Sequence, residues 1–374
     1  MLLVSSPTLG TEEKTALADV IDSGWITMGS RVRRFEEAFA AMHGAADAVA
    51  VNSCTAALHL ILLSLGIGPG DEVLVPSLTF TASVNAILYV GAKPVFVDIE
   101  SLDHPILSLA DAEEKCTART RAAIVVHYAG YVANAAAWQD LAARRNFTLV
   151  EDAAHAAGAE GVGRLGAASA FSFYGNKNMT TGEGGMVLAA DPEHLARMRL
   201  CRGHGLTSGT FERRTASVPS YDVVALGFNY RLDDMRAAIG LSQLARLPAW
   251  NERRRALTQL YFACLDRHAP MVGLPFRDLV DAPDAGSAHH IMPVVLPEEA
   301  ERERVAAALS AADIQTSNHY PPVHTLSYYR ATLEPVELPV TEAFARRQLT
   351  LPLHPAMTDE DVGRVSRTLG AVLN

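Results

Sequence analysis

The chain has 374 residues, and its 42 acidic side chains outnumber its 32 lysines and arginines, which gives a formal net charge of −10. Hydrophobic residues make up 49% of the sequence, enough for a large core, so a wholly disordered chain is excluded. The acidic balance argues against bulk binding of nucleic acid or anionic membranes, because both require a basic field.

Helix and strand patterns alternate through the first two thirds of the chain. The segment 34–43 has the spacing of an amphipathic helix, a short strand follows over 46–52, and the apolar run 56–66 predicts the next helix. Further strand patterns follow over 71–77, 93–99, 121–130, 147–158 (with its outgoing loop), 168–175 and 184–190. Helix patterns lie between them over 81–91 and 136–146. This alternation indicates β–α units, and therefore an α/β fold with a mostly parallel sheet covered by helices on both faces.

The pattern changes near residue 250. A long helix is expected over 250–268, and the remainder contains a strand pattern at 291–297 and a helix pattern at 301–311. We therefore expect a large domain over 1–250, including the N-terminal segment, and a smaller C-terminal α+β domain over 251–374.

The four cysteines are scattered, without C-x-x-C or the spacing of metal ligands, so neither a disulfide framework nor a metal site is expected. The N-terminal residues lack the basic and long apolar regions of a signal peptide. The apolar run 56–67 contains a histidine and is too short to cross a bilayer. We expect a cytoplasmic protein that binds neither nucleic acid nor membrane.

Polar groups follow several of the predicted strands, and ligands of parallel sheets bind beyond the carboxyl ends of the strands. The turn at 53–55 opens an apolar helix, so its backbone N–H groups and the Thr55 hydroxyl suit a phosphate. Ordinary helix capping by this turn is the more common alternative. Ser172 could add a hydroxyl, and Phe80 is placed either to stack on an aromatic ring or to pack in the core.

Lys177 stands among small and polar residues just after a predicted strand. Such a lysine can form a Schiff base if its surroundings lower its pKa enough to supply the neutral amine. Asp152 ends an apolar strand, where it can pair with the pyridinium nitrogen of pyridoxal phosphate or equally cap a helix. His155 lies on the following turn. Taken alone, Lys177 would be read as an exposed loop lysine and His155 as a loop histidine, so the case rests on their combination.

The sequence 161–166, GVGRLG, matches the G-x-G-x-x-G fingerprint of dinucleotide-binding proteins. That motif requires a strand immediately before it and a helix after it. Here a strand-like segment follows instead, so we interpret the motif as a glycine turn.

In combination, the motifs resemble those of the DegT/StrS-type sugar aminotransferases, which are fold-type I enzymes dependent on pyridoxal phosphate. The resemblance covers most of the chain in order, through GWITMG, NSCTAALHL, PGDEVLVPSLTFTASVNAI, GAKPVFVDI, VHYAG, VEDAAHAAGA, FSFYGNKNMTTGEGGMV, GFNYRLDDMRAAIGLSQL, HYPPVH and LTLPLHPAMT. It implies transfer of an amino group, from L-glutamate, to a nucleotide-linked keto-sugar in amino-sugar biosynthesis.

The resemblance also implies roles for individual residues. Lys177 would form the Schiff base, Asp152 would pair with the pyridine nitrogen, and His155 would lie near the cofactor's phenolic oxygen. Relatives that carry histidine in place of the lysine are dehydratases, so Lys177 favours transamination. Phe80 would stack on the cofactor ring.

The phosphate cup of the family matches Cys54, Thr55 and Ser172, although relatives often carry glycine where Cys54 stands. Asn229 resembles a residue that reaches the phosphate from the neighbouring subunit, which implies a homodimer with shared active sites. Segments that the family uses around its substrate contain Arg231, His319, Tyr320 and His324.

Two other functions remain open at this point. A keto-cyclitol aminotransferase of the scyllo-inosose type would use the same fold, cofactor and lysine. A non-enzymatic regulatory or DNA-binding protein is a remote alternative, because the charge is acidic and no recognition-helix pattern stands out. The loop 203–221 is either a lid over the substrate or an ordinary surface loop.

Overall fold

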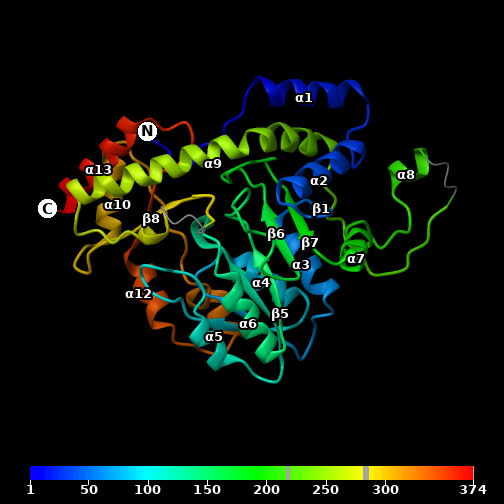
Figure 1. Ribbon diagram of the computed structural model, residues 1–374, viewed down its shortest axis with the longest axis horizontal. Coiled ribbons are helices and arrows are strands. Elements are labelled where there is room, and N and C mark those ends of the chain that lie inside the picture. The colour runs from blue at the N-terminus through cyan, green and yellow to red at the C-terminus, as the bar shows by residue number, and fades with distance from the viewer. Residues whose placement is uncertain (216–219, 281–285, 374) are drawn as a thin grey trace.

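The computed structural model describes residues 1–215, 220–280 and 286–373 (Figure 1). A seven-stranded sheet lies at its centre, in the order β1-β7-β6-β5-β4-β2-β3, with only β7 antiparallel to its neighbours. The strands are β1 (Ala48–Val51), β2 (Glu72–Pro76), β3 (Lys93–Val97), β4 (Thr120–Val126), β5 (Thr148–Asp152), β6 (Ala168–Ser172) and β7 (Gly185–Ala189).

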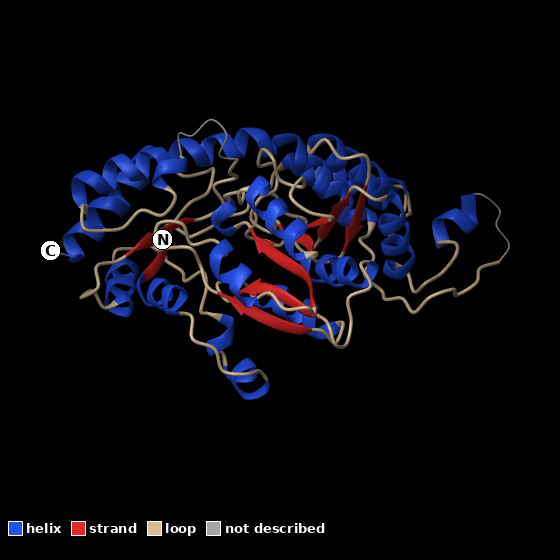
Figure 2. Cartoon of the chain, turned by 60° about the horizontal axis from the view of Figure 1, so that its bottom comes forward, coloured by secondary structure: helices blue, strands red, loops and turns tan. Residues whose placement is uncertain are grey.

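Helices cover both faces of this sheet, as the alternating pattern predicts (Figure 2). Alternate strand residues point to opposite faces: Val73 and Val75 pack in the core beneath α3 and α4, and Leu74 packs in the core beneath α5 and α6. The helices of this part are α1 (Thr11–Asp22), α2 (Ser30–Met42), α3 (Cys54–Ser64), α4 (Thr81–Tyr89), α5 (Leu109–Lys115), α6 (Ala135–Arg145), α7 (Pro192–Arg202) and α8 (Thr210–Thr215), with the 3-10 helix η1 (Tyr128–Gly130).

The long helix α9 (Asp234–His268) begins well before the expected start at residue 250, and Pro248 lies inside it. Proline removes one helical hydrogen bond and normally ends or kinks a helix. Here Leu244 and Leu247 are buried against the second core of the large sheet, and this packing offsets the lost bond. The expected domain boundary therefore falls within a continuous helix, and the division into two domains stays a prediction.

The C-terminal part builds a core of its own around a two-stranded antiparallel sheet. The second half of α9 packs against it, through Leu257, Tyr261 and Leu265. Its elements are η2 (Arg277–Leu279), β8 (Met292–Val295), α10 (Arg302–Ala311), η3 (Val323–Thr325), α11 (Ser327–Thr332), α12 (Pro339–Arg347), β9 (Gln348–Leu351) and α13 (Asp359–Leu373).

The G-x-G-x-x-G motif forms a turn, which confirms the sequence interpretation. Gly161 and Gly163 adopt positive φ values of 79° and 86°, a conformation that favours glycine. The buried Glu151 carboxylate fixes the turn, because it accepts hydrogen bonds from the N–H groups of Gly163 and Leu165 at 2.9 and 3.0 Å. The motif therefore carries no nucleotide-binding helix.

The segment 203–221 leaves the body of the molecule, and α8 stands apart from the rest at the right of Figure 1. Residues 216–219 of this segment lie outside the described residues. In the described ranges, no helix combines the length and apolarity needed to span a membrane. Those ranges also hold no group of three or more histidine, cysteine or acidic side chains suited to a metal ion.

Candidate active site

A cavity of about 420 Å³ opens at the carboxyl edge of the large sheet. The strand ends converge there because β1, β2, β4, β5 and β6 run in the same direction. The cavity brings together most of the predicted site residues, namely Cys54, Thr55, Phe80, Asp152, His155, Ser172, Lys177, His319 and Tyr320.

Lys177 lies in the connection between β6 and β7. Two hydrogen bonds to the Phe173 carbonyl, from Thr181 N at 3.0 Å and from Thr180 Oγ1 at 3.1 Å, close this connection into a compact loop. Burial lowers the pKa of the Lys177 amine from its ordinary 10.5 to about 8, although the nearby Asp152 carboxylate acts in the opposite direction. A substantial fraction of neutral amine therefore exists at mildly alkaline pH.

Asp152 is the last residue of β5, and only 5% of it is exposed. Its Oδ2 accepts a hydrogen bond from Ser83 Oγ at 2.7 Å, and its Oδ1 accepts one from Ala154 N at 3.2 Å. The Ser83 hydroxyl also lies 2.8 Å from Thr79 Oγ1. No helix begins at Asp152, so the helix-cap alternative fails, and a buried carboxylate is left facing the cavity without a cationic ion-pair partner among the described residues.

His155 follows on the turn after β5 and is 5% exposed. Its Nε2 lies 2.8 Å from the Tyr320 hydroxyl, while its Nδ1 is buried and has no hydrogen-bond partner in the described part of the chain. Burial holds the pKa of His155 well below the ordinary 6.5. The imidazole is therefore neutral at pH 7 and retains one unused ring nitrogen.

The N-terminus of α3 forms another part of the cavity wall. Ser53 caps this helix by accepting the Ala56 N–H at 3.1 Å, so Cys54 and Thr55 stand in the first turn. Gly185 packs so closely beneath the turn that a Cβ there would lie 2.8 Å from Cys54 N. The unpaired N–H groups of a first turn and its positive dipole suit an anion.

Three predicted site residues are not among the residues that line this cavity. Arg231 forms an isolated bridge to Val51, the last residue of β1, and Asn229 forms one to Gly203, the residue that follows α7. His324 contacts Ser77 and Glu342 through its two ring nitrogens, at 2.7 and 3.4 Å. Their functional roles stay predictions.

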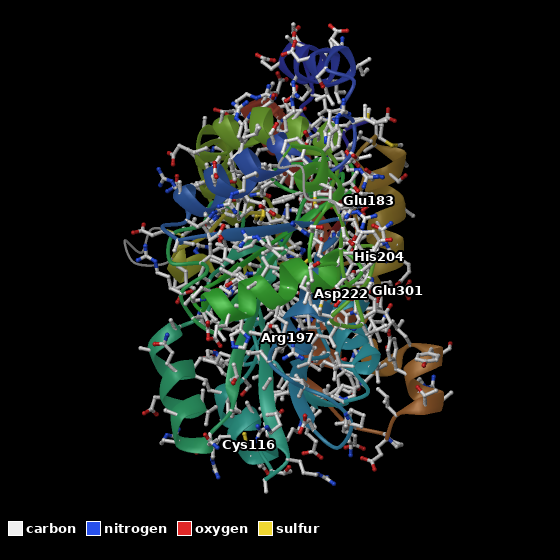
Figure 3. All side chains as sticks on the ribbon, turned by 90° about the vertical axis from the view of Figure 1, so that its right-hand side faces the viewer. Cys116, Glu183, Arg197, His204, Asp222 and Glu301 are labelled. Atoms are coloured by element: carbon white, nitrogen blue, oxygen red, sulfur yellow. The ribbon has the colours of Figure 1, made fainter. Side chains whose placement is uncertain are left out.

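The cavity is also lined by residues that the sequence analysis did not single out. Glu183 is exposed at its wall (labelled in Figure 3), and Tyr174 and Asn176 flank Lys177. All three belong to the same motif as Lys177, so their closeness to Lys177 in the sequence could have predicted that they line the cavity. Thr79 also lines the cavity and lies next to the predicted Phe80 in sequence, but its hydrogen bond to Ser83 is recognisable only from the structure.

Comparison with known proteins agrees with this geometry. The sequence model of the DegT/DnrJ/EryC1/StrS aminotransferase family matches residues 7–370. The chain belongs to this family. Solved structures also match. DesV from S. venezuelae is 40% identical, with a TM-score of 0.87, over 96% of this chain and 94% of that one.

Two further structures extend the comparison. PseC from Helicobacter pylori, an aminotransferase involved in the biosynthesis of pseudoaminic acid, is 27% identical with a TM-score of 0.91, over 100% of this chain and 99% of that one. Spr1654 from Streptococcus pneumoniae, named as a sugar aminotransferase and solved in its PLP-form, is 29% identical with a TM-score of 0.90, over 99% and 98%. The chain is therefore a pyridoxal phosphate-dependent aminotransferase of sugar biosynthesis, with the predicted fold-type I architecture.

The residues present in this aminotransferase fit the cofactor. The unused Nδ1 of His155 and the buried Asp152 carboxylate are polar groups that a pyridoxal ring can satisfy. The first turn of α3 offers N–H groups to a phosphate. Lys177 supplies an amine of lowered pKa.

The lowered pKa of Lys177 leads to a prediction for cofactor uptake. Only the neutral amine attacks an aldehyde, so the rate of covalent uptake by cofactor-free enzyme should rise about tenfold per pH unit below pH 8 and level off above it. Stopped-flow absorbance of added pyridoxal phosphate measures this rate. A rate that kept rising to pH 10, as a solution lysine analogue should show, would contradict the buried amine.

Proposed function

We propose that this aminotransferase moves the amino group of L-glutamate onto a nucleotide-linked keto-sugar, with Lys177 as its catalytic base. One observation carries the proposal: Lys177 and the buried Asp152 carboxylate line the same cavity, and the pKa of the Lys177 amine is lowered there. The aminotransferase family supplies the chemistry, and the similar PseC is an aminotransferase involved in the biosynthesis of pseudoaminic acid.

When bound, pyridoxal phosphate supplies an aldehyde that condenses with amines and a pyridine ring that withdraws electrons. Lys177 Nζ would hold the aldehyde carbon until the amino donor displaces it. The freed Lys177 amine would then carry the proton from the donor Cα to the former aldehyde carbon, so that the donor leaves as its keto acid and its nitrogen stays behind. The same proton transfer in reverse would place that nitrogen on the keto-sugar.

The other cavity residues bind and orient in this proposal. Asp152 keeps a proton on the pyridine nitrogen, which stabilises developing negative charge on carbon. His155 donates a hydrogen bond to the phenolic oxygen, and Phe80 packs against the ring. The phosphate group would be held by the first turn of α3 and by side chains of the cup: Cys54, Thr55 and Ser172.

We further propose that the working unit is a homodimer in which Asn229 of one chain reaches the cofactor phosphate of the other. The position of Asn229 outside the cavity wall of its own chain supports this arrangement. Mixing Lys177→Ala chains with Asn229→Ala chains tests it, because a mixed dimer regains one intact site only if the sites are shared.

The acceptor is proposed from the family and from the cavity's charge. Among the described residues that line the cavity, Lys177 is the only lysine or arginine, so a sugar diphosphate needs cations from elsewhere. Arg231 and the second chain are the proposed source. His319 and Tyr320, which line the cavity, and His324, which does not, are the proposed neighbours of the sugar.

A screen of acceptors decides the proposal. UDP-, dTDP- and GDP-linked keto-sugars and keto-inositols are each offered with L-glutamate or L-glutamine, and NMR of the product identifies the aminated carbon. We expect turnover with L-glutamate and one of the nucleotide-linked sugars. Turnover only with keto-inositols would replace this acceptor class by the cyclitols, and turnover only with L-glutamine would replace the donor.

The proposal also includes a division into two domains and a cellular location. The division into domains at 1–250 and 251–374 is supported by the hydrophobic core around β8 and β9, whose buried residues all lie between Leu257 and Leu369. A cytoplasmic location is supported by four free cysteines, which suit a reducing compartment.

A further inference from the structure

A hydrogen bond joins two distant parts of the chain at the wall of the cavity. His155 follows β5 of the large sheet, whereas Tyr320 lies in the connection between α10 and η3, 165 residues later. Their side chains meet with the Tyr320 hydroxyl 2.8 Å from His155 Nε2 and with their ring planes 29° apart. The roles predicted from the sequence for His155 and Tyr320 do not require this contact.

The C-terminal side of this contact is held firmly in place. The residue before Tyr320 is His319, whose carbonyl accepts a hydrogen bond from Tyr128 Oη at 2.6 Å and whose N–H donates to Gln348 Oε1 at 3.1 Å. The His319 ring is fixed by Thr350 Oγ1 at 2.9 Å from its Nδ1. The Tyr320 hydroxyl is thus positioned by protein contacts alone.

The direction of the bond follows from the state of the two groups. Burial raises the pKa of Tyr320, and the Asp152 charge adds to that shift, so the phenol keeps its proton. Burial lowers the pKa of His155, so its imidazole is neutral and carries one N–H. If Tyr320 donates to Nε2, that N–H must be on Nδ1. The opposite direction would leave the phenol proton without an acceptor among the described residues.

The neighbouring ring limits how His155 can turn. The His290 ring lies 4.2 Å from it, centroid to centroid, and is itself fixed by Asn178 Oδ1 at 2.8 Å from its Nδ1. His155 therefore presents one defined nitrogen, the buried Nδ1 that has no partner in the described part of the chain.

We propose that Tyr320 is a positioning residue that sets the tautomer of His155, so that Nδ1 carries the proton and serves as a hydrogen-bond donor to the phenolic oxygen of pyridoxal phosphate. The inference rests on the proposed role of His155 and adds the group that prepares it. A fixed donor costs no reorganisation when the anionic oxygen arrives. The Tyr320 hydroxyl of the C-terminal part thereby contributes to cofactor binding indirectly, through its hydrogen bond to His155.

The tautomer can be observed directly with histidine labelled by ¹⁵N. In cofactor-free enzyme, two-dimensional spectra report which ring nitrogen carries hydrogen, and a His155→Gln variant assigns the signal. We expect the Nδ1–H form alone in the wild type and a mixture of both forms in Tyr320→Phe. Tyr174→Phe removes another cavity hydroxyl and should leave the Nδ1–H form unchanged. A wild-type Nε2–H form, or no change in Tyr320→Phe, overturns the inference.

Cofactor affinity gives a second measure that does not depend on activity. Tyr320→Phe should raise the apparent dissociation constant of pyridoxal phosphate about tenfold, roughly the effect of one oriented hydrogen bond. In the His155→Gln background the same substitution should change it less than about twofold, since the residue to be oriented is gone. An equal effect in both backgrounds overturns the inference, whereas failure of the wild type to bind pyridoxal phosphate would instead defeat the proposed function.

Discussion

Replacement of Lys177 by alanine is expected to lower multiple-turnover transamination by at least about 10⁴-fold. The substitution removes both the amine that holds the cofactor aldehyde and the base that moves the proton at the donor Cα. Cofactor should still bind through the remaining cavity groups, although without a covalent bond. Steady-state kinetics measures the first effect, and visible absorbance after dialysis measures the second.

A matched control shows whether the loss of turnover is specific to Lys177 or follows from replacing any lysine by alanine. Lys93 is exposed and pairs with Glu334 on the surface at 2.6 Å, away from the cavity, so Lys93→Ala should retain normal turnover. Borohydride treatment of the wild type should attach the cofactor to the peptide that contains Lys177. Continued multiple turnover by Lys177→Ala would show that another group performs the proton transfer.

The Asp152→Asn variant is expected to keep the cofactor but to lose about 10²- to 10³-fold in kcat. Asparagine has nearly the same size and still offers an oxygen to the Ala154 N–H, so the end of β5 should remain intact. It carries no negative charge, however, and cannot keep the pyridine nitrogen protonated. The loss should therefore appear in kcat, whereas the affinity for pyridoxal phosphate changes much less.

Asp191→Asn provides the comparison for this substitution. Asp191 caps α7 by accepting the Glu193 N–H at 2.8 Å, and asparagine caps helices about equally well. This variant should match the wild type in both kcat and thermal stability. If Asp152→Asn showed wild-type turnover, the carboxylate would be reduced to a structural role at the end of the strand.

Particular residues show how far the sequence alone could lead to the candidate site. Asp152 and Ser172 end the adjacent strands β5 and β6, which run parallel to each other, so both residues lie at the same edge of the sheet. Lys177 follows the same edge within a single short connection. Local pattern is sufficient here because a strand's direction and its last residue together determine where the side chain lies.

Other parts of the site depend on contacts between distant segments. The Ser83 hydroxyl reaches Asp152 across 69 residues, and Tyr320 reaches His155 across 165. No local period encodes such pairs, because they form only when the packed helices and the C-terminal connection come together. Pro248 inside α9 has the same explanation, since buried neighbours outweigh a local helix-breaking preference.

The alternating patterns by themselves determined the α/β fold class, because periodicity is a local property of the chain, whereas the reacting groups were indicated by the combination of motifs that resembles the aminotransferase family. Tertiary structure decided which of those groups share a cavity. It brought Lys177, Asp152 and His155 together and lowered the pKa of the amine by burial. It also left Asn229 and Arg231 outside that cavity wall, because burial and proximity arise only from the packing of the whole chain.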